Sequence, residues 1–380
     1  MEGIVKRVIR VIDDWKMERG ITQNLNIDFT HQQKRILLCY LGYAHINKMY
    51  QRSAHHTNVC EMFQIIHTLV ELDFCIDVCS FDHADALKYV GQKQYDYILG
   101  MGEAFRSAIA EHKEAKSIIY MTENPYYISM QEEEKRIDYL YRRRKVKTKL
   151  ERTGKFYFPD DEAKANFIIC MGETKYYQVL NKPTQRIYPT ANRNEQWSNN
   201  TDKRKSTNFL VFGTGGFVHK GNDLLVEVFS KHADWNLYLC GRDIKKEIKK
   251  LKYLLPNNIH DCGYVGVNSE RFLTLISECT YILLPSASEG MPTGVLTGMQ
   301  HGLIPVVMHG IGMDEFEDYC EYFDGYKISD IENKLVALVK DDRIEDKSNK
   351  IYQFANEKFS LQQFSKRFKK IIETIMMEEA

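Results

Sequence analysis

Short apolar runs rich in β-branched residues alternate along the chain with longer polar segments in which apolar residues recur at helical spacing. This alternation predicts strands joined by helices, and therefore right-handed crossovers and a mostly parallel sheet with helices on both faces. In the first half of the chain, the expected strands are residues 35–41, 74–80, 95–99, 117–121 and 166–171. The expected helices between them are residues 57–72, 103–112 and 130–150.

A polar stretch at residues 190–206 contains almost no apolar residues and is typical of a linker. The alternation restarts after it and continues through most of the second half. The pattern therefore predicts an α/β protein of two doubly wound, Rossmann-like domains, at residues 34–190 and 207–345. The expected strands of the second domain are residues 208–212, 235–240, 280–284 and 303–308, with helices at 221–231, 243–254, 269–278 and 294–301.

Both ends of the chain carry an apolar stripe at helical period. Residues 1–33 are expected to form a leader helix and a linker. The leader helix either packs on the protein body, which is the favoured interpretation, or attaches to a membrane surface. In the tail, residues 346–380, Ser360 is a candidate cap for a last helix. Periodicity leaves open whether this helix packs across both domains or on its own domain alone.

The composition of the 380-residue chain is globular, with 43% apolar and 27% charged residues. Its 52 Lys and Arg balance 52 Asp and Glu, which argues against a nucleic-acid partner, since such binding depends on excess positive charge. Nine cysteines, an odd number without C-x-x-C spacing, predict reduced core residues. Because no apolar stretch has the length of a membrane span and no signal-peptide pattern occurs, we expect a cytoplasmic protein.

Loops that leave strands are the candidate sites, because open parallel sheets bind ligands beyond the C-terminal ends of their strands. Residues 213–221 (GTGGFVHKG) follow an expected strand; their glycines let a phosphate approach the backbone, and Lys220 supplies positive charge. A tight turn with a solvated lysine is the alternative interpretation. Residues 285–290 (PSASEG) follow another strand, and Glu289 is able to accept hydrogen bonds from sugar hydroxyls. Its alternative role is that of a charge at a helix N-terminus.

The segment from P-S-x-x-E-G to H-G-L-I-P-V, residues 285–306, resembles the donor-site signature of retaining glycosyltransferases of family 4, the glycosyl transferases group 1. The resemblance also covers the turn ending in Lys220-Gly221, then Gly241, and residues 262–265, in the expected order. It implies the GT-B fold, in which two Rossmann-like domains face each other across a cleft and the C-terminal helices cross back to the N-terminal domain.

The resemblance also implies roles for individual residues. Glu289 is expected to contact the donor sugar and Lys220 the diphosphate. These two residues are expected to be catalytic, together with Glu123, which is a candidate from its place after a strand and not from the family pattern. Two positions depart from the family pattern, since Thr297 replaces a glutamate that binds the ribose and Thr214 replaces an arginine of the glycine-rich turn. The expected donor-binding residues are Gly42, Gly213, Thr214, Gly215, Gly216, Lys220, Glu289, Gly290, Met291, Pro292, Thr293 and Thr297.

The N-terminal half is expected to hold the acceptor. Gly42 follows the first strand of this half and would let the donor diphosphate approach, while His45 would touch either substrate or simply be solvated. After the strand at residues 117–121, where the family often has a histidine, this chain has Thr122, Glu123 and Asn124. Glu123 is the candidate for orienting the acceptor hydroxyl, and Thr122 and Asn124 are candidate acceptor contacts. Asn-Pro after a strand is also ordinary turn chemistry.

The segment from Arg142 to Lys149 holds six positive charges in eight residues. It suggests either attraction to an anionic membrane surface or lipid-linked acceptor, or a solvated helix face, which is favoured. No histidine or aspartate pattern indicates a metal site, so we expect no metal and no other cofactor.

These observations predict a glycosyltransferase that moves a sugar from a nucleotide-sugar donor to a hydroxyl of a glycan or lipid-linked acceptor, with retention. Bacterial polysaccharide or glycoconjugate biosynthesis is the expected setting, with the protein in the cytoplasm or at the inner face of the membrane. A non-catalytic sugar-nucleotide-binding protein of the same fold and a nucleotide-sugar epimerase are the alternatives.

Overall fold

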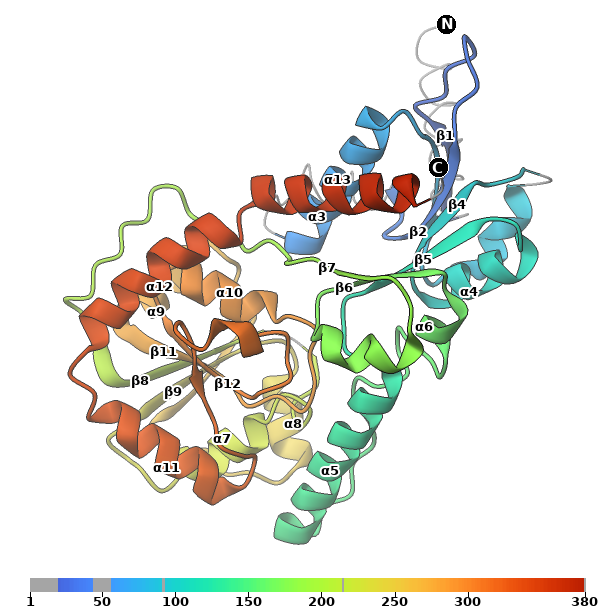
Figure 1. Cartoon of the computed structure of the whole chain (residues 1–380). Helices are drawn as coiled ribbons and strands as arrows, with labels where there is room; N and C mark the ends of the chain where they lie inside the picture. The colour runs from blue at the N-terminus through green and yellow to red at the C-terminus, as the bar shows by residue number, and fades with distance from the viewer. Residues whose placement is uncertain (1–19, 44–55, 91–92, 214, 379–380) are drawn as a thin grey trace, which may run out of the picture.

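The protein, seen in a computed structural model, consists of two domains that are each built on one largely parallel β-sheet (Figure 1). The structure describes residues 20–43, 56–90, 93–213 and 215–378. The two sheets correspond to the two expected Rossmann-like domains. A polar segment connects the domains, and they have the arrangement of the GT-B fold. The leader helix, expected before residue 20, lies outside the described residues.

The N-terminal sheet has the strand order β1-β3-β2-β4-β5-β6-β7. All neighbouring strands are parallel except β1, which pairs with β3 in the antiparallel direction. The strands are β1 (Ile21–Leu25), β2 (Arg35–Tyr40), β3 (Cys75–Ser80), β4 (Tyr97–Gly100), β5 (Lys116–Met121), β6 (Phe167–Cys170) and β7 (Thr184–Arg186). The helices are α3 (Thr57–Glu71), α4 (Gly102–Glu111), α5 (Tyr126–Arg144) and α6 (Asp161–Lys164), with 3-10 turns η1 (Ala84–Tyr89) and η2 (Thr174–Leu180).

Strand β1 corrects the expected domain boundary, because part of the supposed linker belongs to the N-terminal sheet. Ile21 pairs with Cys79 and Leu25 with Ile76, and the buried Ile21 packs in the core. An edge strand buries little of its surface, so its sequence (ITQNL) lacks the apolar run that marks the central strands.

The C-terminal sheet has the order β10-β9-β8-β11-β12-β13 and is parallel throughout. Helices lie on both sides of it (Figure 1). The strands are β8 (Lys205–Phe212), β9 (Asn236–Cys240), β10 (Ile259–Gly263), β11 (Cys279–Leu284), β12 (Ile304–Val307) and β13 (Glu321–Tyr322). The helices are α7 (Asn222–Phe229), α8 (Ile244–Lys250), α9 (Glu270–Glu278), α10 (Thr293–Gln300), α11 (Ile328–Val339), α12 (Ile344–Lys358) and α13 (Leu361–Met377), with the 3-10 turn η3 (Asp314–Phe316).

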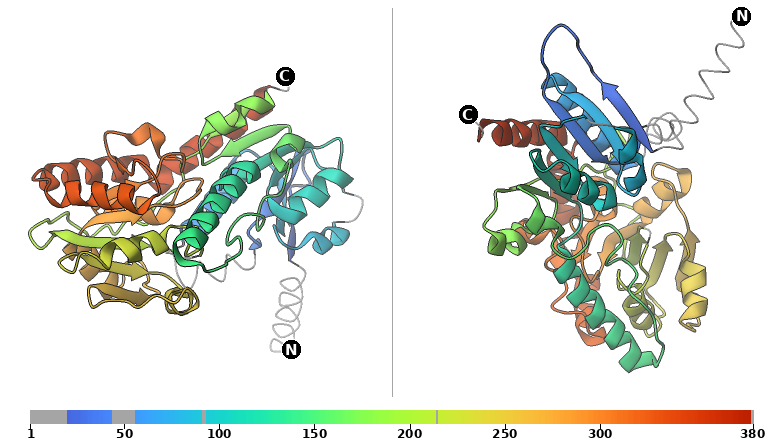
Figure 2. Two further views of the ribbon diagram at one scale, coloured as in Figure 1. Left: turned by 90° about the horizontal axis from the view of Figure 1, so that it is seen from below. Right: turned by 90° about the vertical axis from the view of Figure 1, so that its right-hand side faces the viewer.

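Helix α5 begins after Pro125 and ends where Lys145 takes a left-handed conformation, φ 57°. It is therefore shifted toward the N-terminus from the expected residues 130–150. The helix leaves the N-terminal domain and lies along the C-terminal one (Figures 1 and 2). Arg136 donates hydrogen bonds to the carbonyls of Pro285 and Ser286 at 2.8 and 3.1 Å. Helix α5 of the N-terminal domain thus contacts the C-terminal domain directly.

The last helix, α13, packs against α3 of the N-terminal domain (Figure 1), so the predicted crossing back is confirmed. Ser360 caps it, as expected, by accepting a hydrogen bond from the Gln363 N–H at 3.3 Å. Its apolar stripe, which includes Phe364 and Phe368, is buried. The chain therefore crosses between the domains twice, once in the linker and once in this tail.

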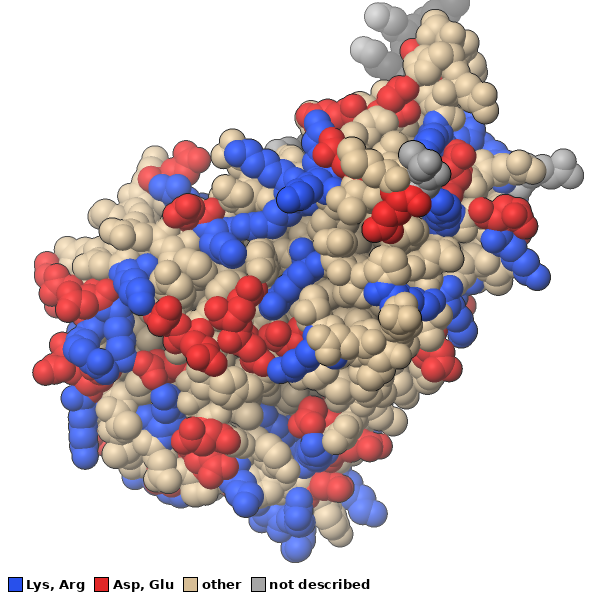
Figure 3. Space-filling view, in the orientation of Figure 1, with Lys and Arg blue, Asp and Glu red and all other residues tan. Residues whose placement is uncertain are grey.

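All nine cysteines are free thiols, and every one except Cys60 is buried, as predicted for reduced core residues. Acidic and basic side chains are interspersed over the face of the molecule in Figure 3, so that face carries no extended basic surface of the kind that nucleic acids require. Among the described residues, no helix combines the length and the apolar character that crossing a membrane requires.

Candidate active site

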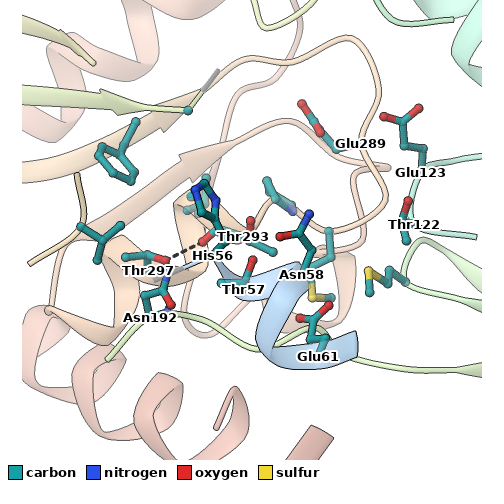
Figure 4. Close-up of a pocket in the computed structure, with 18 of the residues that line it drawn as sticks. His56, Thr57, Asn58, Glu61, Thr122, Glu123, Asn192, Glu289, Thr293 and Thr297 are labelled. Atoms are coloured by element: carbon teal, nitrogen blue, oxygen red, sulfur yellow. Dashed lines mark hydrogen bonds between the residues drawn. The ribbon is translucent and has the colours of Figure 1, made fainter. Parts of the chain in front are cut away.

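A cavity of about 480 Å³ lies between the two domains. Ends of strands from both sheets open into it, because Tyr40 and Met101 line it from the N-terminal side and Phe212 and Leu284 from the C-terminal side. The first turn of α3 and the loops after β5, β8 and β11 also line it (Figure 4). The strand exits that the sequence marks as candidate sites therefore converge on one space.

Lys220 and Glu289 meet in this cavity. The Lys220 Nζ lies 2.7 Å from the Glu289 Oε1, and the Ser286 hydroxyl donates to the same oxygen at 3.1 Å. Burial by itself would raise the pKa of Glu289, but the positive charges of Lys220 and Arg152 outweigh it and lower the pKa to about 2. Glu289 is therefore a carboxylate, and an acceptor of hydrogen bonds, at any physiological pH.

The topology explains why these two loops meet. Strands β8 and β11 are parallel neighbours, with Phe209 opposite Tyr281, so the loops that follow them leave the same edge of the sheet. Gly221, with φ 72°, then brings the first loop against the second. A Cβ at this position would lie 2.4 Å from the Pro285 carbonyl oxygen, so only glycine fits there.

His219 lies behind this pair, and the sequence did not single it out. It is buried, its Nε2 is 2.6 Å from the Ser288 carbonyl oxygen, and its Nδ1 is 3.4 Å from the Glu133 carboxylate. These contacts join the glycine-rich turn, the loop that carries Glu289, and helix α5. No sequence signal marks this histidine, because its partners come from three separate segments.

Thr122 and Glu123 line the cavity from the N-terminal domain. Thr122 donates its backbone N–H to the Tyr157 hydroxyl at 2.7 Å. Glu123 forms an ion pair with Arg152, a residue that the sequence analysis did not identify. Burial acts to lower the pKa of Arg152, but Glu123 and Glu289 outweigh it and hold that pKa above its ordinary value. Two carboxylates and two cations therefore alternate across this part of the cavity.

The segment that carries Arg152 is fixed by two further carboxylates. The Glu133 side chain on α5 accepts backbone N–H groups from Arg152 at 3.0 Å and Thr153 at 2.9 Å. Burial would raise the pKa of Glu133, but hydrogen bonds and the charge of His219 lower it to about 2. Glu151 accepts the N–H groups of Val218 and His219 at 2.9 and 2.8 Å. The loop of the N-terminal domain that carries Glu151 and Arg152 is thus hydrogen-bonded to the glycine-rich turn of the C-terminal domain.

The opposite end of the cavity is lined by polar groups, including Thr297 and the first turn of α3 (Figure 4). The Thr297 hydroxyl donates to the Thr293 carbonyl at 2.8 Å and accepts from the Asn192 N–H at 3.4 Å. Glu61 on α3 accepts the N–H of Thr190 at 2.6 Å, and burial raises its pKa to about 8. Glu61 was not expected here, because its spacing in the sequence is that of a buried helix face.

Several expected site residues have other surroundings. Asn124, a candidate acceptor contact, is not in the lining of the cavity; its buried amide donates to the Gly310 carbonyl at 2.8 Å and to the Ser288 hydroxyl. Gly290 is not in the lining and packs closely against the N-terminal domain, since a Cβ there would lie 2.1 Å from the Thr122 carbonyl oxygen. Gly42 follows Leu41, which lines the cavity, but is not itself in the lining.

The remaining expected donor residues divide between two spaces. Gly213, Met291, Pro292 and Thr293 line the main cavity. Gly215 and Gly216 line an adjoining hollow of about 410 Å³ that shares Gly213 and Lys220 with it. His45 and Thr214 lie outside the described residues. Within the described residues, no group of three His, Cys, Asp or Glu side chains has the arrangement that holds a metal ion.

The basic segment at residues 142–149 is not a uniformly solvated helix face, which corrects the favoured interpretation. Arg143 is largely buried and pairs with Asp223 and Glu227 of the C-terminal domain. Arg144 donates to the Lys252 carbonyl at 3.0 Å and stacks on the Tyr253 ring. Two of the six positive charges therefore join the domains, and the helix ends before the last three.

Comparison with known proteins agrees with this geometry. Residues 207–341 match the family described as Glycosyl transferases group 1. Curated proteins give no match to the chain.

Solved structures give matches over both domains. HepE from Anabaena, in complex with UDP and glucose, aligns with a TM-score of 0.55 at 12% identity over 91% of this chain and 100% of that chain. Sucrose-phosphate synthase from Thermosynechococcus elongatus aligns with a TM-score of 0.62 at 11% identity over 91% and 100%. TarM from S. aureus aligns with a TM-score of 0.52 at 16% identity over 77% of this chain and 59% of that one. At these identities the likeness shows the fold. The chain thus has the GT-B fold, and its residues 207–341 are similar to the glycosyl transferases group 1 family.

Proposed function

We propose that the protein transfers a sugar from a nucleotide-sugar donor to an acceptor hydroxyl, with retention of configuration at the anomeric carbon. The observation that carries this proposal is the Lys220–Glu289 pair, 2.7 Å apart, in the cavity between the two domains. A cation and a carboxylate side by side match the two parts of such a donor, because one favours the diphosphate and the other accepts from sugar hydroxyls.

The C-terminal domain binds the donor. Lys220 and the turn from Gly213 to Gly216 take the diphosphate, whose negative charge increases as the bond to the sugar breaks. Glu289 takes the sugar hydroxyls together with the backbone N–H groups of Met291 and Thr293, on either side of Pro292 at the start of α10. Thr297 faces the ribose and offers one hydroxyl. Glu289 is suited to this role because it is already ionised and oriented by Lys220 and Ser286.

The N-terminal domain binds the acceptor, with Thr122 and Glu123 nearest to the reacting carbon. Glu123 and Glu289 come from facing loops of the two domains (Figure 4). Retention of configuration follows from the resemblance of residues 285–306 to retaining enzymes. The reaction needs no divalent metal, because Lys220 and the N–H groups of the turn stabilise the departing diphosphate.

The acceptor is a glycan or a lipid-linked glycan of bacterial polysaccharide or glycoconjugate biosynthesis. The basic segment supports contact with an anionic membrane surface through its exposed members Arg142, Lys145, Lys147 and Lys149. Such contact places the enzyme at the cytoplasmic face of the membrane. HepE was crystallised with UDP, so UDP-sugars are the first donors to test.

The test starts from the nucleotide. The melting temperature of the protein is measured with UDP, GDP, ADP and dTDP, since a ligand that binds the native state alone raises it. The matching sugar nucleotides are then incubated with glycan and lipid-linked acceptors, in the presence and absence of EDTA. Transfer of the sugar with retention supports the proposal. Conversion of the donor alone indicates an epimerase, and binding without any turnover indicates a non-catalytic protein.

A further inference from the structure

The charges that line the described part of the cavity leave no positive charge unpaired. The acidic and basic side chains there are Glu61, Glu123, Glu289, Arg152 and Lys220, of which Glu61 keeps its proton up to about pH 8. Lys220 is paired with Glu289, and Arg152 is paired with Glu123. A diphosphate brings at least two negative charges into this space. It binds well only if a cation leaves its carboxylate for the phosphate oxygens.

Arg152 lies close to the glycine-rich turn, so its guanidinium group is within reach of phosphate oxygens bound there. A Cβ built on Gly215 would be 3.4 Å from the Arg152 Nη1, and a Cβ built on Gly216 would be 3.2 Å from its Cγ. The guanidinium group therefore lies over the glycine-rich turn, although the turn belongs to the C-terminal domain and the arginine to the N-terminal one. The absence of side chains on the two glycines leaves room there for phosphate oxygens.

The backbone beneath Arg152 is held in place. The buried Glu133 carboxylate binds the N–H groups of Arg152 and Thr153, and the Glu151 carboxylate binds the turn itself through Val218 and His219. Because the backbone is fastened on both sides, the guanidinium group is able to change partner by rotation of its side chain alone. No movement of one domain relative to the other is required.

We propose that Arg152 is a second diphosphate-binding cation, supplied by the N-terminal domain, and that it exchanges Glu123 for the phosphate oxygens when the donor binds. The exchange frees the Glu123 carboxylate to accept a hydrogen bond from the acceptor hydroxyl. Donor binding therefore precedes productive acceptor binding. This inference rests on the proposed function, because it requires a diphosphate in the cavity.

The experiment measures binding of inorganic pyrophosphate, and of the nucleoside diphosphate found by thermal stabilisation, by isothermal titration calorimetry. Arg152→Met is expected to weaken both affinities about tenfold, as expected for a lost charge-assisted hydrogen bond. Glu123→Gln is expected to strengthen them about threefold or more, because Arg152 no longer has to leave a carboxylate. The double variant should bind as weakly as Arg152→Met alone, since the gain from Glu123→Gln acts only through Arg152.

Controls separate folding and general charge from the exchange. Lys113→Met removes one exposed positive charge of the same domain, outside the linings of both cavities, and should change the affinity little. Arg152→Lys keeps the charge and should retain part of the affinity. Circular dichroism and the melting temperature of each variant establish that it is folded.

Three results would overturn the inference or its basis. If Arg152→Met binds pyrophosphate like the wild type while Lys220→Met does not, the Arg152 inference fails and the proposed function stands. If Glu123→Gln weakens binding, Glu123 positions Arg152 instead of competing for it, and the exchange is wrong. If the wild type binds neither pyrophosphate nor any nucleoside diphosphate, the proposed function itself fails.

Discussion

The Nζ of Lys220 lies 2.7 Å from the Oε1 of Glu289, although the two residues are separated by 69 positions in the chain. The pair forms because β8 and β11 are parallel neighbours and the loops after them meet at one edge of the sheet. Lys220 keeps Glu289 ionised, and the contact orients both side chains. The site is therefore prepared before any ligand arrives, which reduces the reorganisation that binding requires.

Removal of either partner should reduce turnover strongly. Glu289→Ala and Lys220→Ala are each expected to lower the rate of sugar transfer at least about tenfold without unfolding the protein. The rate is measured with a labelled donor, and the fold is checked by circular dichroism. Lys231→Ala is the matched control, since it removes a half-exposed lysine that is paired with Glu332 outside both cavities. Wild-type rates in both Glu289→Ala and Lys220→Ala would contradict the assignment of the site.

Glu61 should make the protein less stable as the pH rises. Its pKa is raised by burial to about 8, whereas in the unfolded chain it is about 4.3. Between these values the folded state holds a proton that the unfolded state has lost, so the free energy of unfolding falls with increasing pH. Relative to Glu61→Gln, we expect the wild type to lose about 1–3 kcal/mol between about pH 5 and pH 8.

This pH dependence is measured by urea unfolding at several pH values. The control is Glu71→Gln, which changes an exposed glutamate on the same helix and should leave the difference from wild type nearly constant with pH. If the curves for wild type and Glu61→Gln run parallel across the range, Glu61 is ionised in the folded protein and the prediction is wrong.

Gly290 should be required for the contact between the domains. A Cβ at this position would lie 2.1 Å from the Thr122 carbonyl oxygen, which is backbone and unable to move aside. Gly290→Ala is therefore expected to cost about 2 kcal/mol or more in the free energy of unfolding. The matched control is Gly266→Ala, because a Cβ at Gly266 meets no atom within 4 Å. Equal melting temperatures for the two variants would mean that the domains do not pack here as described.

The basic segment should divide into structural and surface residues. Arg143→Met leaves the buried Asp223 without its partner and is expected to destabilise the protein by about 3 kcal/mol. Arg142→Met changes an exposed neighbour and should leave the melting temperature unchanged. Binding to vesicles that contain anionic lipid should fall when Arg142, Lys145, Lys147 and Lys149 are changed together to Gln. This division would be contradicted if Arg143→Met left the melting temperature unchanged. It would also be contradicted if the variant with all four substitutions bound the vesicles like the wild type.

The sequence alone determined the two largely parallel sheets, the linker between them and the place of Lys220 and Glu289 in loops that leave strands. These features depend on local signals: apolar runs mark buried strands, and glycines with a polar group mark the loops that leave them. Parallel neighbours then bring their exits to the same edge. Strand β1 was missed because it lacks this local signal: an edge strand needs few apolar residues, so no apolar run marks it.

Only the tertiary structure decided what faces the cavity from the other domain. Arg152, Glu133, Glu151 and His219 meet across the domain boundary, and Asn124 and Gly290 are used for packing between domains. The periodicity of a segment reports whether its side chains are buried, and it carries no information on which distant segment buries them. The relative position of two domains results from many such contacts together, so these partners become visible only once the chain is folded.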